Sequence, residues 1–250
     1  MIILKTDKEL SVMKEAGRIS ANALKLAGKA VEPGVTTKQI DKIIRNYIES
    51  QGARPSFLNY GGFPASACIS VNDVVIHGIP SEKCVLKEGD IVSIDVGACF
   101  NGFHGDNAFT FPCGDISKEA RNLLDTTYQS LLLGIKAAQK GSRIGDIAST
   151  IQKYAEARNY SVVRDFVGHG VGAKLHEDPS VPNFGKPGRG VRLTPGMTIA
   201  IEPMINAGSY EVEILDDEWT TVTVDGKLSA HFEHSIAITE DGPLILTLAD

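Results

Sequence analysis

Two carboxylates in the first half of the chain lie in an apolar context that predicts burial. The stretch LKEGDIVSIDVGACFNGFHGD, residues 86–106, carries Asp95 inside an apolar run and Asp106 just beyond a turn at Phe100-Asn101-Gly102. Antiparallel pairing across that turn would place the two side chains opposite or nearly opposite each other, about 5 Å apart at Cβ. Two bare carboxylates there would repel each other, and buried charge is costly. The hairpin therefore predicts either one partly exposed Asp at each strand edge or a shared cation.

The second half of the chain supplies a similar pair of acids. Glu202 lies in the apolar stretch MTIAIEPMI, and Glu233 lies in SAHFEHSIAIT with His231 and His234 beside it. A salt bridge would explain either Glu taken alone, yet no Lys or Arg occurs within the strand-like stretches that hold the four acids. Hard carboxylate oxygens suit divalent cations, and a bridging carboxylate suits two ions. Four acids in this context predict a dinuclear, oxygen-rich metal site.

Three histidines lie in segments that could reach such a site. VGHGVGAKLHE places His169 between glycines and His176 seven residues later, and CISVNDVVIHGIP places His77 at the end of an apolar strand. Taken singly, the first two are ordinary loop residues and His77 is a buried core histidine. Beside an acid cluster, an imidazole shifts the choice toward transition metals, and His77 becomes a candidate for stabilising a substrate or transition state. The predicted chemistry is metal-activated water attacking a carbonyl or phosphoryl group.

Helix pairs and β-rich segments alternate along the chain and must position these residues. Apolar spacing predicts helices at 7–30, 36–51, 117–140 and 145–158. Pro33-Gly34 and Gly141 separate the members of each pair, and Thr36 or Thr37 can cap the second helix. The β-rich stretches are 66–78, 90–111, 161–172 and 197–240.

The chain also contains an internal similarity at an offset of 107 residues. The shift aligns Lys29-Ala30 with Lys136-Ala137, Gly34 with Gly141, Ile40 with Ile147, Ile44 with Ile151, Tyr47 with Tyr154, and Asp95 with Glu202. A period this long is not that of a solenoid. It predicts two halves, each a helix pair plus a sheet, packed about an approximate two-fold axis with the sheets inside and the site at their junction.

Composition narrows the class of protein. The 250 residues can bury a sizeable core and include no run of about 18 apolar residues, and the N-terminus becomes charged after four residues. We therefore expect no membrane span, no secretory signal and a cytoplasmic location. The net charge of −6, without a basic cluster, argues against a nucleic-acid partner. The four cysteines form no CxxC pair and are expected to be free thiols.

At this point the motifs HGIP, DVG…HGDNAFTF, GHGVG…HE, IEPM and FEHS resemble those of type I methionine aminopeptidase, in order and over essentially the whole chain. That resemblance implies an α+β pita-bread fold with the metal site at the centre. It implies one catalytic domain over 1–250, made of repeats at about 7–111 and 117–240. The implied reaction removes the initiator methionine of nascent proteins when the second residue is small, by metal-activated water attack on the peptide carbonyl. The implied partners are nascent N-termini at the ribosome, and we expect a monomer.

The resemblance also implies roles for individual residues. The implied ligands of two divalent ions, from among Mn, Fe, Co and Zn, are Asp95, Asp106, His169, Glu202 and Glu233. Asp95 would chelate one ion, Asp106 and Glu233 would bridge both, and His169 and Glu202 would complete the other. Glu202 would also act as general base, while His77 and His176 would contact the scissile peptide and its oxyanion or leaving amine.

An apolar pocket must hold the methionine side chain. The matching positions are Tyr60, Phe63, Cys68, Leu175 and Trp219. Simple packing is the alternative for Trp219, the only tryptophan. Leu175 stands where many relatives carry an aromatic residue, and Phe57 stands where some carry Cys, so both bear on the shape of the pocket.

Proteins with three other functions have the same fold. Xaa-Pro peptidases resemble this chain in fold and in the five ligands, but they usually carry an additional N-terminal domain. A creatinase-like enzyme keeps the fold without the metals, and a binding protein of this fold has lost catalysis. Both are expected to lack ligands that this sequence retains.

Overall fold

The computed structural model describes residues 1–250. Its helices are α1 (Asp7–Lys29), α2 (Thr37–Ser50), α3 (Lys118–Ala137) and α4 (Ile144–Glu156), with a short 3-10 turn, η1 (Tyr60–Gly62). The four expected helices are therefore present, each within three residues of the expected bounds. Thr36, rather than Thr37, caps α2, since the Gln39 N–H donates to Thr36 Oγ1 at 3.2 Å.

All strand pairing is antiparallel, within four small sheets. One sheet contains β1 (Arg54–Pro55), β4 (Ile91–Phe100) and β2 (Cys68–Val71), with β5 (Phe103–Pro112) also paired to β4. A second contains β13 (Ser229–His231), β10 (Met204–Asn206) and β6 (Ser161–Val162), and a third contains β11 (Val212–Ile214), β12 (Thr221–Thr223) and β3 (Val74–Ile76). The last runs β15 (Gly242–Ile245), β14 (His234–Thr239), β9 (Thr198–Ile201), β7 (Gly168–Gly170) and β8 (Glu177–Val181).

The β4–β5 hairpin corrects one detail of the expected register. Its turn is only two residues long, Asn101 and Gly102, both with positive φ (47° and 84°), as a type I′ turn requires. Asp95 therefore faces Ala108, and Asp106 faces Gly97, so the two acids lie on a diagonal. They share one face of the hairpin as expected, but diagonal partners are farther apart than directly opposite ones.

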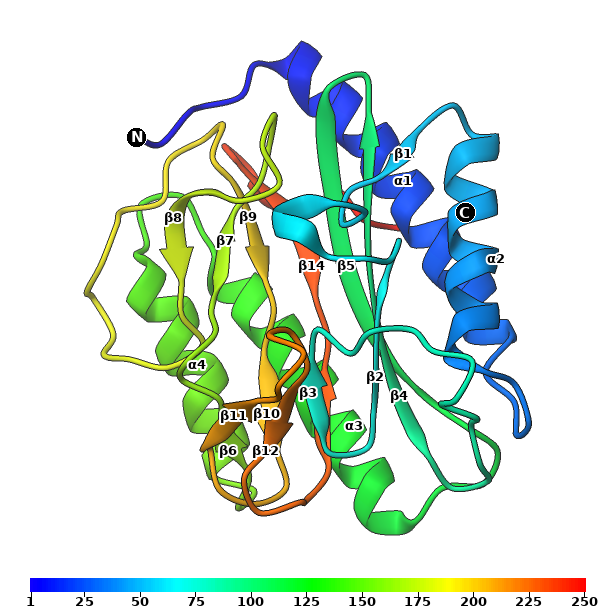
Figure 1. The fold of residues 1–250 in the computed structure, drawn as a ribbon. Helices are drawn as coiled ribbons and strands as arrows, with labels where there is room; N and C mark the ends of the chain where they lie inside the picture. Colours follow the sequence, from blue (N-terminus) through cyan, green and yellow to red (C-terminus); the bar gives the residue numbers. More distant parts are fainter.

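Two hydrophobic cores lie between the helices and the strands. In the first half, α1 and α2 pack on β2 and β4 through residues such as Ile19, Ile40, Ile44 and Ile94. In the second half, α3 and α4 pack on β9, β13 and β14 through residues that include Leu123, Leu131, Ile147, Ile199 and Ile236. Figure 1 shows α1 and α2 at the right, against the long hairpin, and α3 and α4 beside and behind the strands of the second half. Helices outside and strands inside follow from one apolar stripe per helix.

The same local contacts occur in both halves, 107 residues apart. Gly34 N–H donates to the carbonyl of Leu86 at 2.8 Å, and Gly141 N–H donates to the carbonyl of Leu193 at 2.9 Å. Isolated antiparallel bridges join Thr36 to Val85 and Arg143 to Arg192. Each helix pair is thus tied to the segment that leads into β4 or β9.

The two halves meet along a seam between β5 and residues 233–235. Glu233 N–H donates to the carbonyl of Ala108 at 2.9 Å. The Ser235 hydroxyl accepts from Asp106 N–H at 3.1 Å and donates to the Asp106 carbonyl at 2.8 Å. These backbone and Ser235 hydroxyl hydrogen bonds across the seam hold one acid of each half in a fixed relation.

Strand β8 was not expected from the sequence. Its residues, EDPSV, are mostly polar and include a proline, which suits an edge strand because proline cannot donate to the ladder. It does lie at the edge of its sheet. No helix combines the length and the apolar character needed to cross a membrane. All four cysteines are free thiols, as expected.

Candidate active site

Every residue proposed from the sequence as a ligand, catalytic group or pocket wall lines one cavity of about 160 Å³. The lining residues are Phe57, Tyr60, Gly61, Phe63, Cys68, His77, Asp95, Asp106, His169, Leu175, His176, Glu202, Trp219 and Glu233. They come from both halves of the chain. The cavity has an acidic end and an apolar end, and distant parts of the sequence contribute residues to each.

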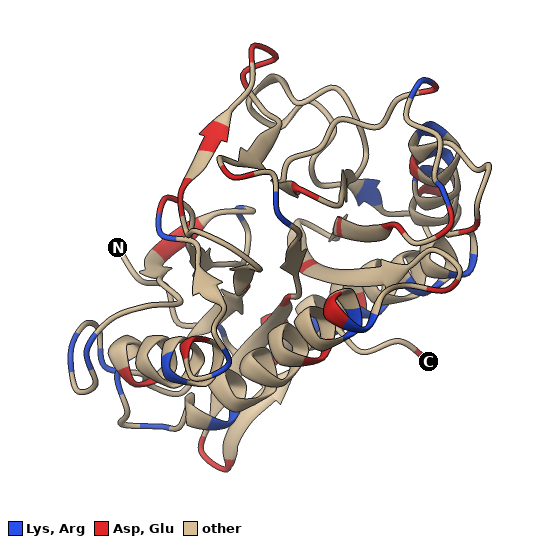
Figure 2. Cartoon of the chain, turned by 90° about the horizontal axis from the view of Figure 1, so that it is seen from below, with Lys and Arg blue, Asp and Glu red and all other residues tan.

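Four carboxylates form the acidic end. Asp95 comes from β4 and Asp106 from β5, while Glu202 directly follows β9 and Glu233 lies between β13 and β14. One carboxylate oxygen each of Asp95, Asp106 and Glu233 is buried without a hydrogen-bond partner. Such atoms are rare in folded proteins because an unsatisfied buried acceptor is costly. In Figure 2, Lys and Arg lie mainly on the helices and outer loops, and none forms an ion pair with these acids.

Burial perturbs the protonation of all four acids. It raises the pKa of Asp95 to about 7, with a further contribution from Glu202, and raises the pKa of Glu202 to about 8. Burial and the neighbouring carboxylates also raise the pKa of Asp106 and of Glu233. Each shift shows that the ionised form lacks compensation by protein groups. A bound cation would provide that compensation, so the donor set and its orphaned oxygens fit divalent metal.

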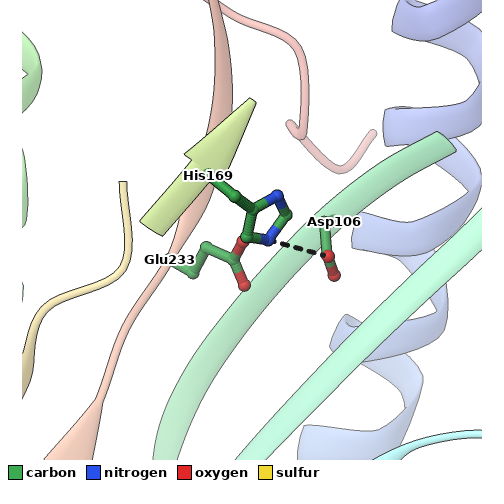
Figure 3. Close-up of side chains that lie close together, drawn as sticks. All are labelled: Asp106, His169 and Glu233. Atoms are coloured by element: carbon green, nitrogen blue, oxygen red, sulfur yellow. Dashed lines mark ion pairs between the residues drawn. The ribbon is translucent and has the colours of Figure 1, made fainter. Parts of the chain in front are cut away.

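The imidazole of His169 adds a nitrogen donor to this cluster. Figure 3 shows its ring lying between the carboxylates of Asp106 and Glu233; one ligand atom from each of the three residues lies within 4.8 Å of the other two. His169 Nε2 is 3.8 Å from Asp106 Oδ2 and 3.5 Å from Glu202 Oε1. Its Nδ1 lies 2.8 Å from the carbonyl of Gly170. A proton on Nδ1 would donate to that carbonyl and leave Nε2 as a free lone pair.

Burial keeps His169 neutral. It lowers the pKa of His169 to about 3, with His176 acting in the same direction. A neutral imidazole is the form that binds metal. Because the ring is neutral, its contacts with Asp106 and Glu202 are not salt bridges. The three side chains are potential ligands of one metal ion.

His77 also lines the cavity and directly follows β3. It has a φ of +59°, which is uncommon outside glycine, and such strain clusters at functional positions. Its ring packs edge-on against Phe166 and Trp219, with centroids 5.7 and 6.1 Å away. Burial, and then the proximity of His231 and His176, lower the pKa of His77 to about 4. The ring is neutral near pH 7 and available as a hydrogen-bond donor.

His176 is held between Tyr60 and His169. Its Nδ1 lies 3.0 Å from the Tyr60 hydroxyl, and its ring packs edge-on against that of His169 with centroids 4.2 Å apart. Burial lowers the pKa of His176. If the Tyr60 O–H donates to Nδ1, the imidazole proton lies on Nε2. That arrangement provides a neutral hydrogen-bond donor at the edge of the carboxylate cluster.

The apolar end is a separate small hydrophobic cluster. Phe57, Phe63, Cys68 and Leu175 are buried in it, and the half-buried Trp219 packs against it with its ring centroid 5.2 Å from that of Phe63. Cys68 lies opposite Asp95 in the β2–β4 pair. This pairing joins the apolar and acidic ends of the cavity directly. Phe57, which the sequence marked only as a departure from the family pattern, belongs to the same hydrophobic cluster.

His231 had no predicted role. Its side chain is buried, its Nε2 has no hydrogen-bond partner, and that atom lies 3.7 Å from Glu202 Oε2. One feature of the sequence pointed to it: His231 lies two residues before Glu233, and residues two apart on an extended chain place their side chains on the same side. The contact with Glu202 depends on the packing of β13 against β10 and was not predictable.

Known proteins share this fold and sequence. A model of metallopeptidase family M24 matches residues 11–240. A methionine aminopeptidase of Clostridium perfringens is 56% identical over 248 residues, covering 99% of both chains. The crystal structure of a methionine aminopeptidase from Thermotoga maritima superposes with a TM-score of 0.98, at 45% identity and 99% coverage of both chains. A prolidase from Pyrococcus horikoshii shares the fold alone, with a TM-score of 0.81 at 22% identity, and this chain covers 65% of it.

The chain therefore belongs to metallopeptidase family M24 and has its pita-bread fold. Within the family, the full-length similarity places it with the bacterial type I methionine aminopeptidases. The buried, unpartnered carboxylates fit the metal dependence of that family.

Proposed function

We propose that this protein removes the N-terminal methionine of new polypeptides when the second residue is small. The observation that carries the proposal is the single cavity that joins a cluster of buried, uncompensated carboxylates to an apolar pocket. A hydrolytic centre beside a methionine-sized apolar pocket is what this reaction needs. Family membership supports the same reaction.

Asp95, Asp106, His169, Glu202 and Glu233 would hold the divalent ions, two in number by this proposal. The set of oxygens with one imidazole suits Mn, Fe, Co or Zn. When bound, such ions lower the pKa of a water molecule and polarise a carbonyl oxygen. The orphaned oxygens of Asp95, Asp106 and Glu233 support this assignment.

Glu202 is the proposed general base. Its carboxylate lies between two imidazoles, with Oε1 3.5 Å from His169 Nε2 and Oε2 3.7 Å from His231 Nε2. It is the acid whose position, directly after β9, combines burial with contact to both histidines. A carboxylate there can accept a proton from the attacking water and return it to the leaving amine.

His77 and His176 are the proposed contacts to the scissile peptide. Both rings are neutral near pH 7, so each can donate a hydrogen bond without introducing a full charge. Donors aimed at the developing oxyanion stabilise the transition state more than the ground state. The strained backbone of His77 and the Tyr60 contact of His176 support fixed orientations for both rings.

Tyr60, Phe63, Cys68, Leu175 and Trp219 are proposed to hold the methionine side chain. Phe63, Cys68 and Leu175 offer buried apolar surface, against which Trp219 packs, and such surface disfavours charged side chains. Packing alone remains the alternative for Trp219, which contacts Phe63 whether or not substrate is bound. The requirement for a small second residue and any contact with the ribosome are further parts of the proposal.

The organisation of the chain is also a proposal. We assign one catalytic domain over 1–250, made of repeats at about 7–111 and 117–240, and the paired contacts at an offset of 107 residues support it. We propose that it works as a monomer in the cytoplasm, where new N-termini emerge, and the free thiols of all four cysteines are compatible with that compartment.

A peptide assay tests the function. The protein, stripped of metal and reconstituted separately with Mn²⁺, Fe²⁺, Co²⁺ or Zn²⁺, is expected to release methionine from Met-Gly-Met and Met-Ala-Ser. It is expected to leave Xaa-Pro dipeptides intact. Efficient Xaa-Pro cleavage without methionine release would assign a prolidase instead, and no turnover with any of the metals would leave only the fold.

A further inference from the structure

A buried ion pair lies just outside the cavity and takes no part in the proposed reaction. Lys5 Nζ is 2.5 Å from Glu177 Oε2, and the two side chains are 3% and 6% exposed. Lys5 belongs to the segment before α1, and Glu177 is the residue after His176. A buried ion pair is weak evidence for stability, because desolvation offsets most of the attraction. Its position next to His176 indicates a role other than stability.

The segment that carries His176 is folded around this ion pair. We call residues 172–177 the strap. Within it, Gly172 N–H donates to the carbonyl of Lys174 at 3.0 Å, and Lys174 N–H donates to Glu177 Oε1 at 3.1 Å. The two oxygens of one carboxylate thus hold the backbone of the strap and the ammonium of Lys5. Removing the ammonium would leave that carboxylate buried and uncompensated.

Close packing ties the pair to the base of the strap. A Cβ on Gly172 would lie 2.5 Å from Lys5 Cε and 2.6 Å from Glu177 Oε1. Both side chains therefore press against the same glycine, and there is no room for either to move toward it. The other face of the strap is fixed to β5, because His104 N–H donates to the Gly172 carbonyl at 2.9 Å.

Lys5 is itself held in place from the opposite side. Its backbone N–H donates to the carbonyl of Gly196 at 2.7 Å, and its ammonium also donates to the carbonyl of Ile3 at 3.1 Å. Figure 1 shows the segment before α1 crossing above the strands of the second half. The ammonium is therefore a fixed point that does not belong to the strap.

We propose that Lys5 is a positioning residue for His176, acting through Glu177 and the strap. The ion pair fixes the strap so that the His176 ring stays beside His169 and within reach of Tyr60. This inference rests on the proposed function and deepens it. Lys5 touches neither the cavity nor any proposed ligand, so its effect on turnover must pass through the strap.

A double-mutant cycle tests the proposal. Lys5→Met is expected to lower kcat on Met-Ala-Ser by about tenfold, because small displacements of a group that contacts the transition state cost one to two orders of magnitude. In a His176→Ala background, the same change is expected to lower kcat by less than about twofold. Metal content, measured on the purified protein, is expected to stay the same in all four proteins.

Thr6→Ala is the matched control. Thr6 follows Lys5 directly and caps α1, since Glu9 N–H donates to Thr6 Oγ1 at 3.4 Å. Its loss loosens the same segment and leaves the ion pair. Thr6→Ala is expected to change kcat by less than about twofold. If Lys5→Met does not fold, Glu177→Gln replaces it in the cycle, because a Gln still accepts from Lys174 N–H but has no charge to pair.

The possible results of this cycle either support the proposal or refute it. An equal loss of kcat with and without His176 would overturn the proposal, as would a rise in KM alone or an equal loss in Thr6→Ala. Hydrogen exchange of the strap amides gives a readout independent of turnover: faster exchange is expected in Lys5→Met and not in Thr6→Ala. If the wild-type protein released no methionine, the proposed function would fail, while unchanged strap exchange would refute the positioning by Lys5.

Discussion

Removing metal from this protein should make the stability that its buried acids contribute fall as pH rises from about 6.5 to 8. In the folded, metal-free protein, burial raises the pKa of Asp95 to about 7 and of Glu202 to about 8, against 3.8 and 4.5 for ordinary carboxyl groups. Above pH 5 the unfolded chain has already lost these protons, so the folded state binds more protons. Stability then decreases with increasing pH until the folded groups ionise.

Buried histidines limit the window in which this effect is visible. Burial lowers the pKa of His77 and His234 to about 4 and of His169 to about 3. Between about pH 4 and the ordinary histidine value of 6.5, the unfolded chain binds more protons at these positions, which increases stability with pH. The two trends oppose each other, and because half of the unfolded histidines are still protonated at pH 6.5, the opposition persists to about pH 7.5. Comparison with a variant that lacks one of the acids removes the histidine contribution.

The size of the decrease follows from linkage. Between pH 6.5 and 8, Glu202 contributes a loss of between about 1 and 2 kcal/mol and Asp95 somewhat less than about 1 kcal/mol, so these two acids together lose about 2 kcal/mol. Each histidine that is neutral in the folded state regains up to about 0.4 kcal/mol over the same range. Asp106 and Glu233, whose pKa values burial also raises, can only add to the loss. A change of this size is a large part of the stability of an ordinary domain.

Urea unfolding of the wild-type protein and of Glu202→Gln in EDTA at pH 6.5, 7.25 and 8 isolates the contribution of Glu202, because both proteins carry the same histidines. The stability of the wild type relative to that of Glu202→Gln should fall by about 1–2 kcal/mol over this range. Added Mn²⁺ or Co²⁺ should abolish this fall, because a bound cation holds the carboxylates ionised. If the stability difference between the two metal-free proteins did not change between pH 6.5 and 8, Glu202 would not be uncompensated, and the argument for a metal site from burial would fail.

Other substitutions separate the parts of the site. Glu233→Ala should lose metal, whereas His77→Ala should keep it and lower kcat by about a hundredfold or more; equal metal loss in both would make His77 a ligand. Trp219→Ala should raise KM for Met-Ala-Ser by about tenfold, through about 1–2 kcal/mol of lost apolar contact, with little change in kcat; an unchanged KM would leave Trp219 a packing residue. Thr36→Ala should lower the free energy of unfolding by about 1 kcal/mol by removing the N-cap of α2, as measured by urea titration, and should leave kcat unchanged; a loss of activity without a loss of stability would contradict that assignment.

Local sequence determined most of the elements. The apolar spacing and the N-cap at Thr36 specify the helices, and Asn101-Gly102 specifies the hairpin turn because only residues that tolerate positive φ fit there. The same stretches identified the four acids, since an Asp or Glu in an apolar strand without Lys or Arg needs another source of positive charge. The polar edge strand β8 escaped notice because its pattern resembles a loop.

Only the tertiary structure decided how these pieces meet. The contact of His231 with Glu202 arises where separate strands converge, and the ion pair of Lys5 with Glu177 joins residues 172 positions apart. Side-chain types and local periodicity are encoded in short stretches of sequence. The relative placement of distant strands depends on the summed packing of both cores across the seam, and no short stretch contains that information.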